Sequence, residues 1–136
     1  MNQEYYNALA TVRLDRAKEL VVESEELLEK EAYKSANNRA FYAIEKSIKA
    51  LLALKKTDVL THNGALKQFK FLYIYNGDGT FTNEDYQMIT RADQIRNASD
   101  YDDFYMASKE ETKQQVENAR KITEKVTKYI ENMSKK

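Results

Sequence analysis

The sequence contains no cysteine, no proline and only 3 glycines among its 136 residues. The lack of cysteine excludes disulfides and thiolate metal sites. The lack of proline and the scarcity of glycine leave little to interrupt a helix. Alanine, leucine, glutamate and lysine, which favour helices, are frequent. These features predict an all-α protein.

An excess of charge of either sign is also missing, because 22 basic residues balance 22 acidic ones. The chain therefore has no overall positive field that would concentrate DNA, RNA or an anionic membrane around it. Any binding of a polyanion must be local. No apolar run approaches the roughly 20 residues of a membrane span, and no apolar signal-like segment opens the chain. We expect a cytoplasmic protein with one domain over residues 1–136.

Apolar residues recur at helical spacing in four long segments, which cover residues 9–30, 36–55, 83–96 and 109–133. A shorter helix is expected over 62–75. Long amphipathic helices with short connections pack as an antiparallel bundle, so we predict four long helices plus one short one. The second segment also carries five alanines, which would let another helix approach closely, either within the fold or across a subunit interface.

Three polar residues are candidates for helix caps. Ser35 precedes the second long segment, and Thr82 precedes the next, with Asp85 as an acidic partner. Ser108 with Glu111 forms the pattern of a capping box before the last segment. These residues predict where three of the helices begin.

The end of the short helix is open to two interpretations. Residues 69–75 alternate aromatic and other residues, and the Asn-Gly-Asp-Gly that follows at 76–79 is typical of a hairpin. A β-ribbon through Thr82 is the alternative to the helix that we favour. Residues 76–85 also resemble part of a calcium loop, but Ile74 would supply no oxygen at its first position. We therefore expect a turn there and no metal.

The stretch from Arg96 to Tyr105 contains most of the candidate binding residues. Arg96 lies at the edge of the buried stripe of a helix that we expect to end near it, and a semi-buried guanidinium needs an anion or a carbonyl as partner. Asp100 is four residues further on and can meet Arg96 if the helix continues that far. Asp100, Asp102 and Asp103 could hold magnesium, pair with arginine or simply end a helix. Tyr101 could donate a hydrogen bond or stack on a base.

His62 is the only histidine, and it stands in Thr61-His62-Asn63-Gly64 at the start of the short helix. One histidine cannot build a multi-histidine zinc site. Its imidazole could act as an acid or base near neutral pH, or could simply bond a neighbouring carbonyl or carboxylate. The sequence shows no partner for it, which favours the structural role.

Residues 39–44, 48–54, 61–64 and 96–103 together resemble the HEPN superfamily, and most closely its small prokaryotic members with a THSG-like motif and an arginine followed by DYD. The resemblance implies a helical bundle, a homodimer and, often, a minimal nucleotidyltransferase partner in a toxin–antitoxin or defence module. Active members of the family are metal-independent ribonucleases. They use an arginine, a polar residue and, a few residues later, a histidine, with two copies meeting across the dimer.

Arg96 and Asn97 match the first half of that ribonuclease motif, but Tyr101, Asp102 and Asp103 occupy the positions allowed for its histidine. We therefore favour binding over cleavage. In this reading a cleft from Arg96 to Tyr105 binds an RNA or nucleotide phosphate, or a partner nucleotidyltransferase.

Each residue of the favoured site has an expected role. Arg96 would hold the anion, Asn97 and Tyr101 would orient it, Asp100 would fix Arg96 in place, and His62 and Asp102 complete the binding set. No cofactor or metal is expected. One alternative is a ribonuclease in which His62 or Tyr101 replaces the missing histidine, and another is a structural interaction protein without a ligand site.

Overall fold

The computed structural model describes residues 2–134, and no strand occurs among them. Their elements are α1 (Gln3–Glu29), α2 (Tyr33–Leu54), α3 (His62–Phe69) with the π-helical continuation η1 (Lys70–Tyr75), α4 (Asn83–Tyr101) and α5 (Lys109–Ser134). The predicted all-α class, with four long helices and a shorter one, is confirmed. No helix among these residues is both long and apolar enough to cross a membrane.

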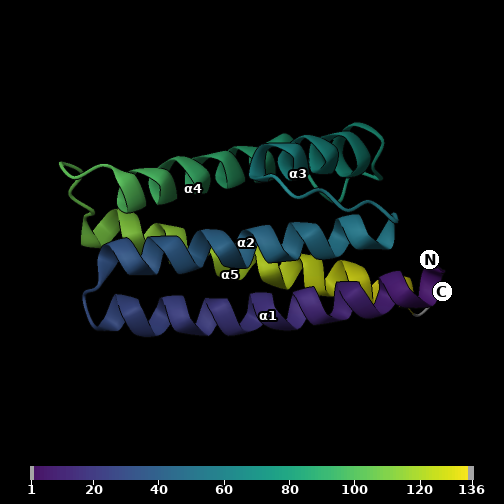
Figure 1. Cartoon of the computed structure of the whole chain (residues 1–136), viewed down its shortest axis with the longest axis horizontal. Coiled ribbons are helices and arrows are strands. Elements are labelled where there is room, and N and C mark those ends of the chain that lie inside the picture. The colour runs from purple at the N-terminus through teal and green to yellow at the C-terminus, as the bar shows by residue number, and fades with distance from the viewer. Residues whose placement is uncertain (1, 135–136) are drawn as a thin grey trace.

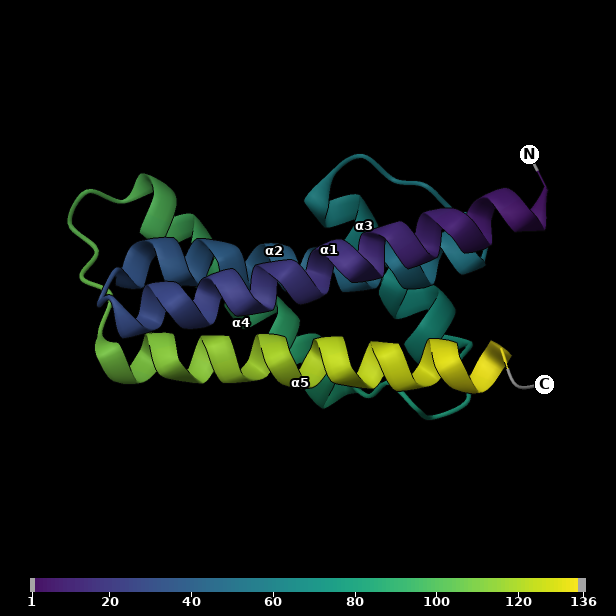
Figure 2. The same cartoon turned by 90° about the horizontal axis from the view of Figure 1, so that it is seen from below.

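The long helices lie lengthwise beside one another, and successive ones run in opposite directions (Figure 1). Helix α2 is central, because it packs against α1, α3, α4 and α5. Helices α1 and α5 also pack against each other on the side shown in Figure 2, and the two ends of the chain lie at the same end of the bundle. Helix α3 lies with α4 on the opposite side of α2 from α1.

The alanines of α2 serve the fold itself. All five have no exposed surface in a single chain: Ala36, Ala40, Ala43, Ala50 and Ala53. Small side chains allow neighbouring helix backbones to approach closely, so α2 can accept several partners at once. Between the alanines, large apolar residues fill the core: Phe41, Ile44, Ile48, Leu51 and Leu52. Of the two uses that the sequence left open, packing within the fold is therefore observed.

The turn between α1 and α2 differs from the prediction. Helix α2 begins at Tyr33, after an N-cap residue, Ala32, whose side chain makes no capping bond. The chain reverses at Glu31, which has a φ of 62°, and the next helix starts almost at once. Ser35 consequently lies inside the first turn of α2, and its assignment as a cap is wrong.

The other two predicted caps are present. The Thr82 hydroxyl accepts a hydrogen bond from the Asp85 amide at 3.2 Å, and the Asp85 carboxylate accepts one from the Thr82 amide at 3.0 Å. Ser108 accepts a bond from the Glu111 amide at 3.0 Å. Glu111 does not complete a reciprocal box, because its carboxylate accepts bonds from Tyr105 and Arg91 instead.

Residues 62–75 are helical throughout, so the alternative of a β-ribbon is wrong. Of the aromatic residues that suggested a strand, Phe69 and Tyr73 face the core, whereas Phe71 and Tyr75 are exposed. Phe69 and Tyr73 form one cluster with Phe81 and Tyr129. Tyr73 donates its hydroxyl to the carbonyl of Leu51, and burial raises its pKa well above the ordinary value. This cluster holds the segment from α3 to α4 against α2 and α5.

Helix α4 runs beyond its predicted end near Arg96 and continues to Tyr101. Asp102 is its C-cap, and the Asp102 amide donates to the carbonyl of Ala98 at 3.0 Å. Arg96 and Asp100 therefore lie one helical turn apart on one face. The extra turn is the main correction to the predicted boundaries.

We expect Thr82→Ala to lower the free energy of unfolding by about 0.5–2 kcal/mol, because it removes the hydroxyl half of a complete capping box. Urea denaturation monitored by circular dichroism measures this change. The control is Thr11→Ala at an exposed position in the first half of α1, which should alter stability by less than about 0.5 kcal/mol. Equal effects of the two substitutions would show that the box does not stabilise α4.

Candidate functional site

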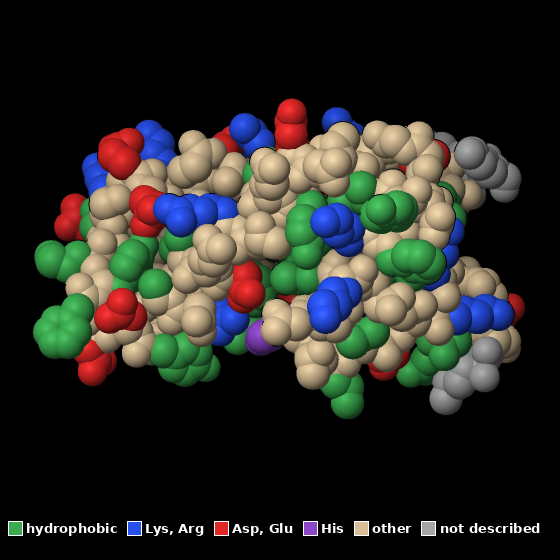
Figure 3. Space-filling view, turned by 90° about the horizontal axis from the view of Figure 1, so that it is seen from above, with side chains coloured by type: hydrophobic (Ala, Val, Ile, Leu, Met, Phe, Trp, Pro, Cys, Tyr) green, Lys and Arg blue, Asp and Glu red, His purple; other side chains and the backbone are tan. Residues whose placement is uncertain are grey.

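A pocket of about 480 Å³ lies between the beginning of α3 and the second half of α4. Three of the predicted binding residues line it together, although they come from separate parts of the chain: His62, Arg96 and Asn97. Its other lining residues are Leu60, Thr61, Asn63 and Asp93. In Figure 3 the imidazole, in purple, is visible at the surface beside acidic and basic side chains, on the face that α3 and α4 cover.

Arg96 is buried, with 6% of its surface exposed. Its Nη2 donates to the Oδ1 of Asp93 at 2.7 Å, and its Nη1 lies 3.8 Å from the Oδ2 of Asp100. The guanidinium also lies over the ring of Phe41, with 4.8 Å between its carbon and the ring centroid. Its Nε is buried and makes no hydrogen bond. Arg96 is therefore fixed from several sides while part of its donor capacity stays unused, which is costly in a buried group.

His62 occupies the first position of α3 and has the partner that the sequence did not reveal. Its Nδ1 is hydrogen-bonded to the Oε2 of Glu45, a buried carboxylate on α2. The imidazole also packs edge-on against the ring of Phe41, with 5.5 Å between the centroids. Phe41 thus contacts both His62 and Arg96, and it holds the two groups of the pocket on one aromatic surface.

The beginning of α3 is shaped by Thr61 and Gly64. The Thr61 hydroxyl caps the helix by accepting a bond from the Gly64 amide at 3.0 Å. A Cβ at position 64 would lie 2.5 Å from the Cγ1 of Val59 and 2.7 Å from that same hydroxyl. Only glycine fits so close an approach without displacing a neighbour. The glycine of the Thr-His-Asn-Gly segment therefore keeps the 55–61 connector pressed against α3, where it forms one wall of the pocket.

Asp100 lies beside Arg96 but outside the pocket lining. Its carboxylate accepts bonds from the Nδ2 of Asn38 on α2, at 3.2 and 3.0 Å, in addition to its ion pair with Arg96. Asp100 therefore links α4 to α2 through Asn38, next to Arg96. Asp93 is the closer partner of Arg96, so the role that we expected for Asp100, holding Arg96, stays a prediction.

Tyr101 and Asp102 do not line the pocket. Tyr101 is 74% exposed at the end of α4, and Asp102 accepts a bond from the amide of Phe104 at 3.0 Å. Tyr105 lies further along the loop and donates its hydroxyl to Glu111. Burial, followed by that hydrogen bond, raises the pKa of Tyr105 to about 12. The stretch from Arg96 to Tyr105 is thus divided between a pocket at its start and an exposed loop at its end.

The aspartates after Arg96 do not assemble a metal site. Asp100 turns toward Arg96 and Asn38, while Asp102 bonds to the backbone of its own loop. Within residues 2–134, no group of three or more His, Asp or Glu side chains is arranged to hold a metal ion. The alternative of a magnesium site at these carboxylates is therefore wrong.

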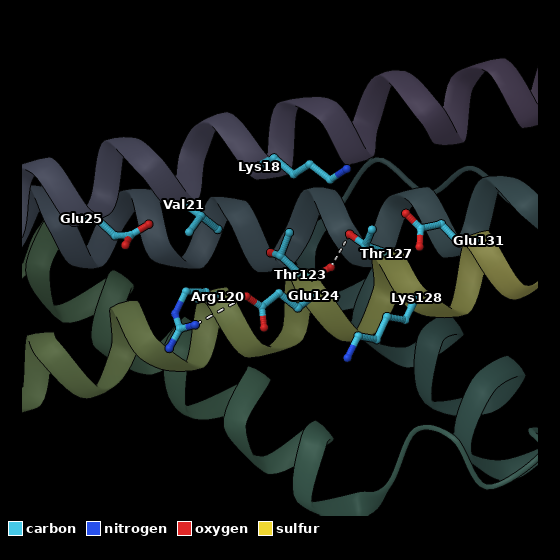
Figure 4. A pocket seen from close by; sticks show the side chains of 9 residues that line it. All are labelled: Lys18, Val21, Glu25, Arg120, Thr123, Glu124, Thr127, Lys128 and Glu131. Atoms are coloured by element: carbon cyan, nitrogen blue, oxygen red, sulfur yellow. Dashed lines mark hydrogen bonds and ion pairs between the residues drawn. The ribbon is translucent and has the colours of Figure 1, made fainter.

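A second cavity, of about 440 Å³, lies between α1 and α5. Figure 4 shows its side chains arranged along the two helices rather than around a common centre, and both signs of charge are present. Arg120 pairs with Glu124 on its own helix at 3.5 Å, and the Thr127 hydroxyl donates to the backbone of Thr123. The pocket at His62 and Arg96 differs from this groove because it brings together predicted site residues from two helices, and it is therefore the candidate site.

Sequence reasoning missed three residues of the site. Asp93 is three residues before Arg96, and this helical spacing was a usable signal. Glu45 stands on the apolar stripe of α2, where a buried acid calls for a partner. Phe41 gave no signal beyond its place in the core.

Comparison with known proteins agrees with the expected family. The HEPN domain profile matches residues 10–133. A protein named "Putative toxin" from Methanocaldococcus jannaschii is 28% identical over 117 residues, which are 86% of this chain and 78% of the relative. A UPF0332 protein of Thermotoga maritima is 27% identical over 120 residues, or 88% of this chain and 89% of the relative. A second "Putative toxin" of Methanocaldococcus jannaschii is 36% identical over 76 residues, 55% of this chain and 54% of the relative.

We expect Gly64→Ala to lower the free energy of unfolding by about 1–3 kcal/mol, because the new methyl group collides with Val59 and Thr61. Val59→Ala removes the nearer of the two contacts. The double variant should therefore be less destabilised than the sum of the single variants, and urea denaturation of all four proteins measures this coupling. Strictly additive effects would show that the connector does not press against Gly64.

Proposed function

This chain belongs to the HEPN domain family, and we propose that it is a component of a toxin–antitoxin or defence-type module that binds an RNA or nucleotide phosphate between His62 and Arg96. The observation that carries the proposal is that these two residues, from α3 and α4, line one pocket and share the ring of Phe41. Two relatives bear the name "Putative toxin", which agrees with such a module. The homodimer and the nucleotidyltransferase partner that we expect belong to the same proposal.

The beginning of α3 favours an anion in this pocket. The amides of His62 and Asn63 stand at the first two positions of the helix and have no carbonyl partner within it. These free donors and the helix dipole make a helix N-terminus attractive to phosphate. The guanidinium of Arg96, which lines the same pocket, supplies full positive charge. The side-chain amide of Asn97 adds a neutral donor.

The carboxylate of Asp93 limits the affinity of the pocket for a phosphate. It already pairs with Arg96 at 2.7 Å, so an incoming phosphate must compete with it for the guanidinium. The chain as a whole carries no net charge. Affinity therefore rests on a few directed contacts rather than on a general basic surface, and we expect it to depend only weakly on salt.

The pairing of His62 with Glu45 favours a second candidate function, a metal-independent ribonuclease. In this mechanism the imidazole accepts the proton of the 2′-hydroxyl or donates one to the leaving oxygen, while Arg96 stabilises the charge on the phosphate. His62 would then perform the task of the histidine that Tyr101, Asp102 and Asp103 replace along α4 and its loop. The acid–base group would come from a different helix.

We expect Arg96→Ala to weaken binding of a fluorescently labelled single-stranded RNA by at least about tenfold, because a charge-assisted contact is worth about 1.5–3 kcal/mol. Fluorescence anisotropy measures the affinity. Arg91→Ala is the matched control, because it removes the same charge from the same helix at an exposed position outside the pocket. Equal affinities of the wild type and a folded Arg96→Ala protein would overturn the binding proposal.

Incubation of the purified protein with RNA in EDTA tests the ribonuclease candidate. If the protein cleaves, His62→Ala should lower the rate by about 10²–10⁴, the usual contribution of a positioned acid or base, and Arg96→Ala should also lose activity. Cleavage that persists in both variants would show that His62 and Arg96 do not perform the reaction. RNA binding without cleavage would leave the pocket a binding site alone.

A further inference from the structure

The carboxylate of Glu45 is unusual for its position. It is 7% exposed on α2, among apolar residues one turn away that include Phe41 and Ile48. A buried carboxylate is costly unless hydrogen bonds or charges satisfy it, and an apolar residue would pack there without that cost. Its partners are His62, through Oε2, and the Nζ of Lys49, which lies 3.9 Å from Oε1. The lysine distance is at the limit of an ion pair, so the imidazole is the close partner.

The contact with Glu45 also decides which edge of the imidazole is free. An ionised carboxylate only accepts hydrogen bonds, so the proton between the two groups belongs to Nδ1 of His62. In the neutral ring Nε2 is then the unprotonated nitrogen, with its lone pair at the opposite edge. The side chain of His62 is 37% exposed and lines the pocket with Arg96.

Two aromatic rings restrict the plane of the imidazole. Phe41 meets it edge-on at 84°, and Tyr42 lies 6.0 Å from it between ring centroids. Rotation of the ring would therefore break the bond to Glu45 and disturb two packed neighbours. The orientation of the ring is therefore restricted by residues of α2.

We propose that Glu45 is a positioning residue, which holds His62 as the Nδ1-protonated tautomer and thereby presents the basic Nε2 to a phosphate or ribose hydroxyl in the pocket. Glu45 itself does not line the pocket and acts through His62. The role for an RNA ligand rests on the proposed function above. The tautomer does not, because it follows from the contact between His62 and an ionised Glu45.

Because His62 is the only histidine of the chain, long-range ¹H–¹⁵N NMR spectra of uniformly labelled protein show a single imidazole and need no assignment. At a pH where the ring is neutral, we expect the wild type to show a protonated Nδ1 and an unprotonated Nε2. Glu45→Gln, which has nearly the same shape, should shift the ring toward a mixture of tautomers. Glu23→Gln on α1 is the matched control, since its carboxylate bonds Arg16 and Arg39, and should leave the spectrum unchanged.

A wild-type spectrum with the proton on Nε2, or a Glu45→Gln spectrum identical to that of the wild type, would overturn the inference. The wild-type spectrum decides the matter even if the variant fails to fold. RNA binding and cleavage are measured on the same samples. If the expected tautomer is present but the protein neither binds nor cleaves RNA, the proposed function fails while the positioning role of Glu45 stands.

Discussion

The close packing around α2 is the constraint on which the rest of the structure depends. Its alanines leave room for neighbouring backbones, and its large apolar residues fill the spaces between them. One stretch of the same helix also carries Phe41 and Glu45, which are four residues apart and therefore neighbours on one face. The ring of Phe41 contacts both Arg96 and His62, and the carboxylate of Glu45 is hydrogen-bonded to His62. The helix that organises the core thus also organises the pocket.

The pocket is built at a cost in stability. Glu45 and Arg96 are both buried, and the Nε of Arg96 has no hydrogen-bond partner. A bundle optimised only for stability would place apolar side chains at these positions, since replacing a buried ion pair by well-packed apolar groups is often neutral or stabilising. Buried polar groups held in fixed positions on rigid helices are what a binding or catalytic site requires. This contrast supports a functional interpretation of the pocket over that of a purely structural bundle.

The division of the stretch after Arg96 also bears on the family resemblance. Tyr101 and the aspartates that replace the usual histidine lie at the exposed end of α4 and in the loop, away from the pocket lining. Arg96 and Asn97 remain at the pocket. The proposed site therefore combines an arginine at the place expected for the family with an imidazole from another helix.

Local patterns in the sequence were sufficient for the helices and for part of the site. Three predictions depend on residues within one or two helical turns of each other: the helical class, the short helix over 62–75 and the capping box of Thr82 and Asp85. Such short spacings can be recognised directly in the sequence. The same holds for Arg96 with Asp100 once α4 extends to Tyr101.

Only the tertiary structure decided that Glu45 bonds His62 and that both His62 and Arg96 pack on Phe41. These contacts join three helices, and they depend on how far each helix slides and rotates against α2. That register is set by the packing of the whole core, which no short stretch of sequence encodes. The sequence by itself determined which residues could take part in the site, and the packing of α3 and α4 on α2 determined which of them meet.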